Sequence, residues 1–196
     1  MTQQSEYAVA VKSGALDAVA TVPGSKSIAH RALICAALAR GDSTIRGLPD
    51  GDDTQAMLQG LMMLGATISI NDADAHIGGS IDLDRTDAVT IDANLAGTTA
   101  RFLTAVGALR RSPITVTGNA SLRSRPMKDL HLALEQLGAS VSWQNEKYCL
   151  PVTVQRGESH IHSVQVAADT SSQFVTSLML IAPILDRKST RLNSSH

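Results

Sequence analysis

Three short segments of the sequence place hydroxyl or amide side chains where a helix is predicted to begin. Residues 25–27 read Ser-Lys-Ser, residues 97–99 read Gly-Thr-Thr, and residues 171–173 read Ser-Ser-Gln. The first turn of a helix has unpaired N–H groups and about half a positive charge, so it attracts anions. Serine and threonine are also ordinary helix caps, and the pattern leaves both interpretations open.

Basic side chains lie in or next to these segments. Lys26 belongs to the first segment, Arg31 follows it by one helical turn, Arg101 follows the second, and Arg125 lies in the loop 121–126. Arginine suits bidentate binding of phosphate or carboxylate. We therefore predict a pocket for more than one anionic group of small molecules. A P-loop is not indicated, because no glycine precedes residues 24–27 at the Walker A spacing.

An internal repeat of 73 residues gives the three segments equivalent positions. Leu-Gly-Ala occurs at residues 64–66 and again at 137–139, each time between a helical pattern and a short strand pattern. Each copy is predicted to read β-α-β-α-β-β, with strands such as 89–91 and 164–166 leading into the first helix of a unit. The third copy has only begun by residue 171. The predicted class is α/β.

The repeat also predicts packing. The first helix of each unit has an alanine-rich face and is the better candidate for burial. If the units surround a pseudo-threefold axis, the starts of these helices point toward one place. We expect Asp52 or Asp53 to cap the second helix of the first unit. Cys35 is expected in the core, whereas His30 could equally line the site or face solvent.

Composition excludes several function classes. The 196 residues are 43% hydrophobic and 18% charged, which is typical of a folded chain and not of a disordered one. A net charge of −1 and 3% aromatic residues argue against a nucleic-acid-binding role. Two cysteines indicate a reducing cytoplasm. The longest apolar stretch, residues 174–185, is too short to span a membrane, and no signal peptide is apparent.

Two further patterns could suggest a metal. His160 and His162 alternate along a predicted strand, but no third zinc ligand is apparent. Residues 50–53 lack the continuation of an EF-hand and are interpreted as a turn and helix cap. No metal site is predicted.

Four segments, in order, resemble the signatures of the 5-enolpyruvylshikimate-3-phosphate synthase family. VPGSKSIAHRAL at 22–33 is similar to P-G-S-K-S-x-x-x-R-A-L, and LAGTTAR at 95–101 to N-A-G-T-A-x-R, with leucine where asparagine is common. RSRPM at 123–127 resembles the family's R-P loop, and DTSSQF at 169–174 its S-S-Q segment.

The resemblance implies transfer of the enolpyruvyl group of phosphoenolpyruvate to the 5-hydroxyl of shikimate 3-phosphate, with release of phosphate. This is a step toward chorismate and the aromatic amino acids, without metal or cofactor. The residues that the resemblance assigns to shikimate 3-phosphate are Lys26, Ser27, Arg31, Ser171, Ser172 and Gln173. Those assigned to phosphoenolpyruvate are Lys26, Gly97, Arg125 and Gln173. It implies a cytoplasmic monomer with no nucleic-acid or membrane partner.

The resemblance also implies a division of the chain. Family members have two lobes of three units each, in an inverted α/β barrel-like fold. Residues 1–20 are expected to belong to the other lobe as a strand segment, with the strand itself at residues 7–11. Residues 21–185 form part of a substrate-binding lobe, with units at about 21–92, 93–166 and 167–185, the last truncated. Residues 186–196 match a translated sequencing adapter and are treated as extraneous.

We therefore expect an inactive fragment, whose catalytic acid and base lie in the missing half. Two other functions stay open. One is a UDP-N-acetylglucosamine enolpyruvyl transferase, which usually has Lys-Asn where this chain has Lys26 and Ser27. The other is a non-catalytic module that binds small phosphorylated ligands.

Overall fold

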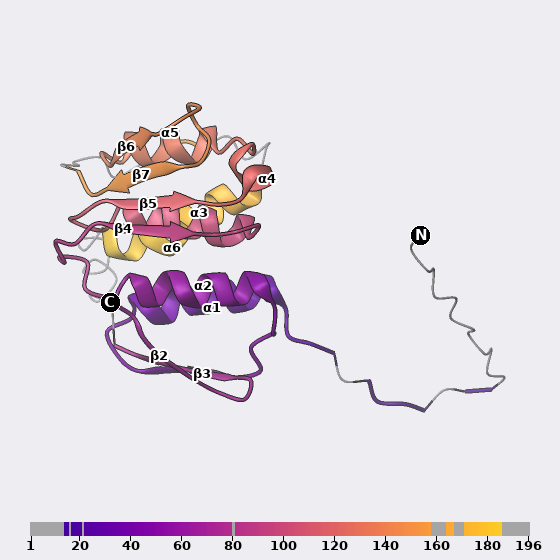
Figure 1. The fold of residues 1–196 in the computed structure, drawn as a ribbon. Coiled ribbons are helices and arrows are strands. Elements are labelled where there is room, and N and C mark those ends of the chain that lie inside the picture. Colours follow the sequence, from indigo (N-terminus) through magenta and orange to yellow (C-terminus); the bar gives the residue numbers. More distant parts are fainter. Residues whose placement is uncertain are drawn as a thin grey trace, which may run out of the picture.

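The computed structural model describes residues 14–15, 17–20, 22–79, 81–157, 164–166 and 171–185. The expectations for a strand at 7–11, for His160 and His162, and for the tail 186–196 lie outside these residues. The described part contains two sheets and the helices between and around them (Figure 1).

The first repeat unit consists of two helices and a three-stranded antiparallel sheet. The sheet has the order β1-β3-β2, and β2 and β3 form a hairpin with Ile68 opposite Ile77. Among the described residues before α1, no strand leads into this unit. The elements are α1 (Lys26–Leu38), β1 (Ser43–Ile45), α2 (Asp52–Met63), β2 (Thr67–Asn71) and β3 (Asp74–Gly78).

The second unit repeats this order and adds a leading strand. Its sheet has the order β4-β5-β7-β6, in which β4 and β5 are parallel and the other pairs antiparallel. A parallel pair needs a crossover, and α3 supplies it. The elements are β4 (Val89–Asp92), α3 (Gly97–Gly107), β5 (Ile114–Thr117), α4 (Ala120–Arg123), α5 (Lys128–Gln136), β6 (Ser140–Trp143) and β7 (Val152–Gln155).

The 73-residue repeat is confirmed by the two sheets. The order β1-β3-β2 in the first unit corresponds to β5-β7-β6 in the second, and each unit has a helix between equivalent strands. A third unit begins with α6 (Ser172–Leu185). The α/β class predicted from the sequence is therefore correct.

Two local predictions were wrong. Residues 164–166 form no strand, because the alternation Val-Gln-Val supplies a pattern but no backbone in the described part of the chain pairs with it. Neither Asp52 nor Asp53 caps α2. Gly51 occupies the N-cap at a φ of 150°, and both aspartates lie inside the first turn.

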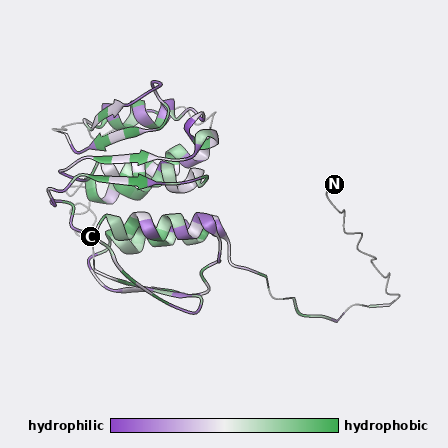
Figure 2. Cartoon of the chain, in the orientation of Figure 1, coloured by the Kyte–Doolittle hydropathy of each residue, from purple (hydrophilic) through white to green (hydrophobic). Residues whose placement is uncertain are grey.

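The first helices of the three units pack together. Helices α1, α3 and α6 each contact the other two, and α3 also packs on β5 and β7 (Figure 1). Helix α3 is the central one, buried almost throughout from Thr99 to Gly107. Figure 2 shows apolar residues gathered on the second sheet and the helices beside it. The predicted burial of the first helices is confirmed most fully for α3.

Helix α1 is buried on one side only. Leu33, Ile34 and Ala37 belong to the core, whereas Ile28 is 69% exposed. Cys35 lies on the exposed side, contrary to the sequence prediction. The cause is helical phase, because Cys35 follows the exposed Ile28 by about two turns and so lies on the same side of α1.

Among the described residues, no helix is both long and apolar enough to cross a membrane.

Candidate functional site: an anion site at converging helix starts

The start of α1 carries an exposed cation held by a neighbouring helix. Lys26 is the first residue of α1, and its Nζ lies 2.5 Å from Oδ2 of Asp53 in the first turn of α2. The lysine side chain is 54% exposed and the aspartate 29%. The N-cap residue Ser25 makes no side-chain capping bond, so its hydroxyl does not stabilise the helix start as an ordinary cap does.

The start of α3 lies beside the start of α2. The Thr99 hydroxyl donates to the backbone carbonyl of Asp53, at 3.3 Å. Helix α3 begins at Gly97, and two guanidinium groups come close to this residue. A Cβ placed on Gly97 would lie 2.8 Å from Nη1 of Arg101 and 3.7 Å from Nη1 of Arg125. The absence of a side chain at Gly97 therefore lets two cations approach the start of α3 closely.

Arg125 stands on a loop that the core fixes at both ends. Before it, the Asn119 side chain caps α4 by accepting from the Leu122 amide, and the Arg125 amide donates to the Leu122 carbonyl. After it, the buried Met127 donates its N–H to the Tyr148 carbonyl at 2.8 Å. The Arg125 side chain is exposed. A fixed backbone thus presents a cation that remains open to solvent.

Helix α6 brings the third segment to the same place. The Ser171 hydroxyl accepts from the Gln173 amide at 3.2 Å, which makes it a helix cap, while its own proton stays available for donation. Ser172 is exposed and Gln173 is half-buried. Arg101 Nη1 donates to Gln173 Oε1 at 2.7 Å, and this contact joins α3 to α6.

Arg31 links α1 to the other two first helices. Its Nη1 donates to the Ser27 carbonyl at 2.7 Å, and its Nη2 donates to the Thr176 hydroxyl of α6 at 3.5 Å. The guanidinium also lies over the ring of Phe102 in α3, 5.6 Å from its centroid. Stacking and hydrogen bonds together orient this cation, which has no acidic partner within the described ranges.

The site has an excess of positive charge. Lys26, Arg31, Arg101 and Arg125 surround it, and of the described residues only Asp53 forms an ion pair with any of the four. Burial lowers the pKa of Arg101, and the nearby Arg125 lowers it further. An arginine whose charged form is disfavoured by burial and by a neighbouring cation gains from binding an anion.

His30 is buried beneath this charged surface and does not face solvent. Both of its ring nitrogens lack a hydrogen-bond partner among the described residues. Burial lowers the pKa of His30, and the nearby Asp53 carboxylate opposes this shift. Lys26 and Arg31 lower the pKa of the imidazole further. His30 is thus a neutral residue under the site, which the sequence left undecided.

The structure brings the sequence-predicted segments together. Lys26 and Arg31 reach the site from α1, Gly97 and Arg101 from α3, and Gln173 from α6; Arg125 approaches Gly97 from its loop. Ser27, Ser171 and Ser172 belong to the same helix starts.

The residues that hold these cationic side chains in place were not identified from the sequence. Asp53 looked like a helix cap but pairs with Lys26. Phe102 and Phe174 are buried in the core, and each has an arginine over its ring. They are the chain's two phenylalanines, and each directly follows a site residue, which was the available signal.

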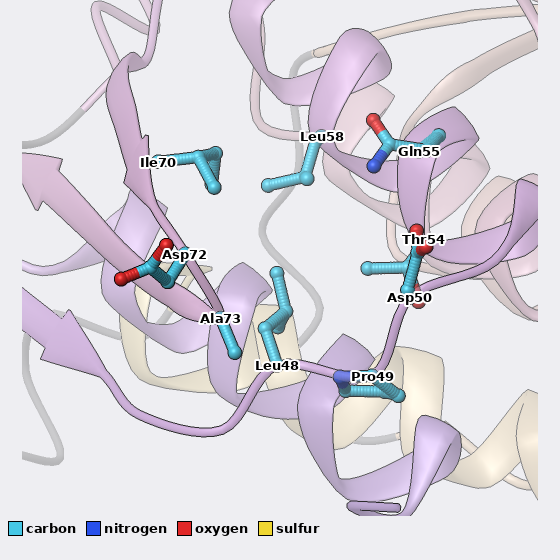
Figure 3. A pocket seen from close by; sticks show the side chains of 9 residues that line it. All are labelled: Leu48, Pro49, Asp50, Thr54, Gln55, Leu58, Ile70, Asp72 and Ala73. Atoms are coloured by element: carbon cyan, nitrogen blue, oxygen red, sulfur yellow. The ribbon is translucent and has the colours of Figure 1, made fainter.

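A cavity of about 270 Å³ lies elsewhere, between α2, the loop before it and the β2–β3 turn (Figure 3). Its lining contains no lysine, arginine or histidine, so it does not suit phosphorylated ligands. The lining residues are Leu48, Pro49, Asp50, Thr54, Gln55, Leu58, Ile70, Asp72 and Ala73. Within the described ranges, no group of three or more His, Cys, Asp or Glu side chains could hold a metal ion.

Several known proteins are similar to this chain in both sequence and fold. Residues 11–195 match the sequence profile of the family described as EPSP synthase (3-phosphoshikimate 1-carboxyvinyltransferase). The 3-phosphoshikimate 1-carboxyvinyltransferase of Shewanella denitrificans is 36% identical over 178 residues, which cover 88% of this chain and 41% of that protein. The enzyme of the same name from Shewanella sp. strain MR-7 is 38% identical over 168 residues, covering 83% and 39%.

Two further similarities agree with these. The pentafunctional AROM polypeptide 2 of Lodderomyces elongisporus is 37% identical over 182 residues, covering 87% of this chain and 12% of that protein. The structure of EPSP synthase from Acinetobacter baumannii superimposes with a TM-score of 0.73 at 28% identity, covering 84% of this chain and 38% of that one. The chain thus spans about 40% of the length of the Shewanella relatives.

The fold and the site define a repeat-built α/β protein with cationic side chains gathered at converging helix starts. The chain belongs to the EPSP synthase family.

Proposed function

We propose that this chain supplies part of an enzyme that transfers the enolpyruvyl group of phosphoenolpyruvate to the 5-hydroxyl of shikimate 3-phosphate, releasing phosphate. The names of its relatives support these substrates over UDP-N-acetylglucosamine. The observation that carries the proposal is the convergence of the starts of α1, α2, α3 and α6 around four cations and one carboxylate.

Each of the two substrates binds at one end of this site. Shikimate 3-phosphate is held by Lys26, Ser27, Arg31 and the start of α6, where Ser171, Ser172 and Gln173 supply hydroxyl and amide donors. Phosphoenolpyruvate lies near Gly97, between Lys26, Arg125 and Gln173. Preorganised donors of this kind stabilise charge without reorganising during the reaction.

Lys26 already has an ionic partner, Asp53, before any ligand binds. In the free protein, the ion pair keeps the ammonium group at the start of α1. A phosphorylated ligand competes with Asp53 for that group, so binding exchanges one exposed ion pair for another. Exposed pairs contribute only about 0–1 kcal/mol, so this competition weakens binding only modestly.

The proposal assigns binding, not turnover, to these 196 residues. The catalytic acid and base are expected in the part of the relatives that this chain does not span. Two free cysteines, Cys35 and Cys149, support a cytoplasmic location. We expect weak, salt-sensitive binding of shikimate 3-phosphate in the millimolar range, about −4 kcal/mol, because charge pairs open to water are weak.

An NMR titration of the ¹⁵N-labelled chain with shikimate 3-phosphate tests the proposal. Amide signals at the starts of α1 and α6 should shift, and Lys26→Met should remove most of the binding. Arg40→Met is the matched control, since it removes a positive charge from an exposed site beyond the other end of α1. It should bind as the wild type does.

Two results would contradict the proposal. Equal shifts in the wild type and Lys26→Met would remove Lys26 from the site. Formation of enolpyruvyl product by the chain alone, with both substrates present, would show that the catalytic groups are already within these 196 residues.

A further inference from the structure

Arg101 lies between α3 and α6 but takes no direct part in the binding scheme above. Its guanidinium lies over the ring of Phe174, 5.5 Å from the centroid, and its Nη1 donates to Oε1 of Gln173 at 2.7 Å. Its Nε is buried and has no hydrogen-bond partner among the residues that the structure describes. Two adjacent residues in the first turn of α6 therefore fix one guanidinium group.

This contact determines which way the Gln173 amide faces. A guanidinium has donors only, so the amide atom that it touches must be the oxygen. The amide nitrogen of Gln173, with its two hydrogens, then remains free to donate. Gln173 is half-buried, so this nitrogen can reach a ligand. A freely rotating amide would offer its oxygen to an anion half of the time, and that contact is repulsive.

The same arrangement occurs in the first unit. Arg31 is four residues after Ser27 and lies over Phe102 of α3, while Arg101 is four residues after Gly97 and lies over Phe174 of α6. In both cases an arginine from one first helix stacks on a phenylalanine of the next. An arginine thus stacks on a phenylalanine at two equivalent positions of the repeat. The second of these arginines, Arg101, contacts the Gln173 side chain.

We propose that Arg101 is a positioning residue, which holds Oε1 of Gln173 so that the amide Nε2 hydrogens face the anionic groups of the ligands. The proposal rests on the proposed function for the identity of those ligands. The orientation of the amide itself is a property of the free protein, and this allows the two to be tested separately.

The first experiment needs no ligand. NMR relaxation of the side-chain amide of Gln173, assigned by its loss in Gln173→Ala, should give an order parameter near the rigid value of about 0.85. In Arg101→Met, which keeps an unbranched side chain over Phe174, it should fall below about 0.6. Arg40→Met is the control and should leave it unchanged. Equal mobility in the wild type and Arg101→Met would overturn the proposal.

The second experiment is a double-mutant cycle with shikimate 3-phosphate. Arg101→Met should weaken binding about fivefold in the wild-type background and less than about twofold in Gln173→Ala, because Arg101 acts through Gln173. Arg101→Lys should recover only part of the loss, since an ammonium lacks the planar fork. A fivefold loss in both backgrounds would overturn the proposal. A rigid Gln173 amide in a chain that binds no shikimate 3-phosphate would instead refute the proposed function and leave the Arg101 contact standing.

Discussion

Acidification should destabilise this protein through one buried histidine. His131 in α5 is fully buried, and its Nδ1 accepts a hydrogen bond from Trp143 Nε1 at 3.0 Å. Because the indole N–H can only donate, Nδ1 must be unprotonated, and the ring is neutral. Burial lowers the pKa of His131 to about 4, from an ordinary value of 6.5.

The sign and size of the effect follow from this shift. The folded pKa is lowered, so the stabilisation is complete above about pH 6.5 and is lost as the pH falls toward 4. Between pH 7 and pH 5 the unfolded chain binds a proton that the folded chain does not, and the free energy of unfolding falls by about 2 kcal/mol. That is a large share of the 5–15 kcal/mol typical of a folded domain.

Urea unfolding at pH 7 and pH 5 measures this loss, followed by the fluorescence of Trp143, the chain's single tryptophan. For a slope of about 1–3 kcal/mol per molar urea, the midpoint should fall by about 1 M. His131→Gln keeps an acceptor for Trp143 but does not titrate, so its midpoint should fall by about 1 M less than that of the wild type. The other buried histidine, His30, is present in both proteins and cancels in the difference between their losses. Equal losses in the wild type and His131→Gln would show that His131 is not the group responsible.

Three further outcomes are expected. Gly60→Ala should lower the free energy of unfolding by about 1–3 kcal/mol in urea titrations, because a Cβ there would collide with Leu103 Cδ1 at the contact between α2 and α3. Gly97→Ala should weaken phosphoenolpyruvate binding several-fold by NMR titration, because its methyl group would lie 2.8 Å from Nη1 of Arg101 and displace the guanidinium group that contacts Gln173. Raising the ionic strength from about 0.01 to 0.15 M should weaken binding of shikimate 3-phosphate in calorimetry, since the Debye length falls from about 30 to 8 Å; salt-independent binding would argue against an open anion site.

The sequence predicted the architecture well because a repeat is a strong signal. The two Leu-Gly-Ala segments mark the same helix end in both units, and the strands that follow them, β2 and β6, occupy equivalent edges of their sheets. The positions of Lys26, Gly97 and Gln173 at helix starts followed from the same pattern. Periodicity locates helix starts, and helix starts are where anions bind.

The remaining features depend on contacts between elements far apart in the sequence. Lys26 and Asp53 are 27 residues apart, and Arg101 and Gln173 are 72 apart. No local pattern pairs them. Cys35 was assigned to the core because its neighbours are apolar, although its side of α1 is exposed. His30 lies on the buried side of α1, and its position in the helical turn determines this as well.

We propose that the converging helix starts bind shikimate 3-phosphate, and a crystal structure of the chain soaked with this compound is the sharpest test. We expect the ligand's phosphate within hydrogen-bonding distance of the start of α1 or α6, with Lys26 Nζ turned from Asp53 toward the ligand. A phosphate bound only in the cavity beside Leu48 and Asp72, with the ion pair between Lys26 and Asp53 intact, would contradict it.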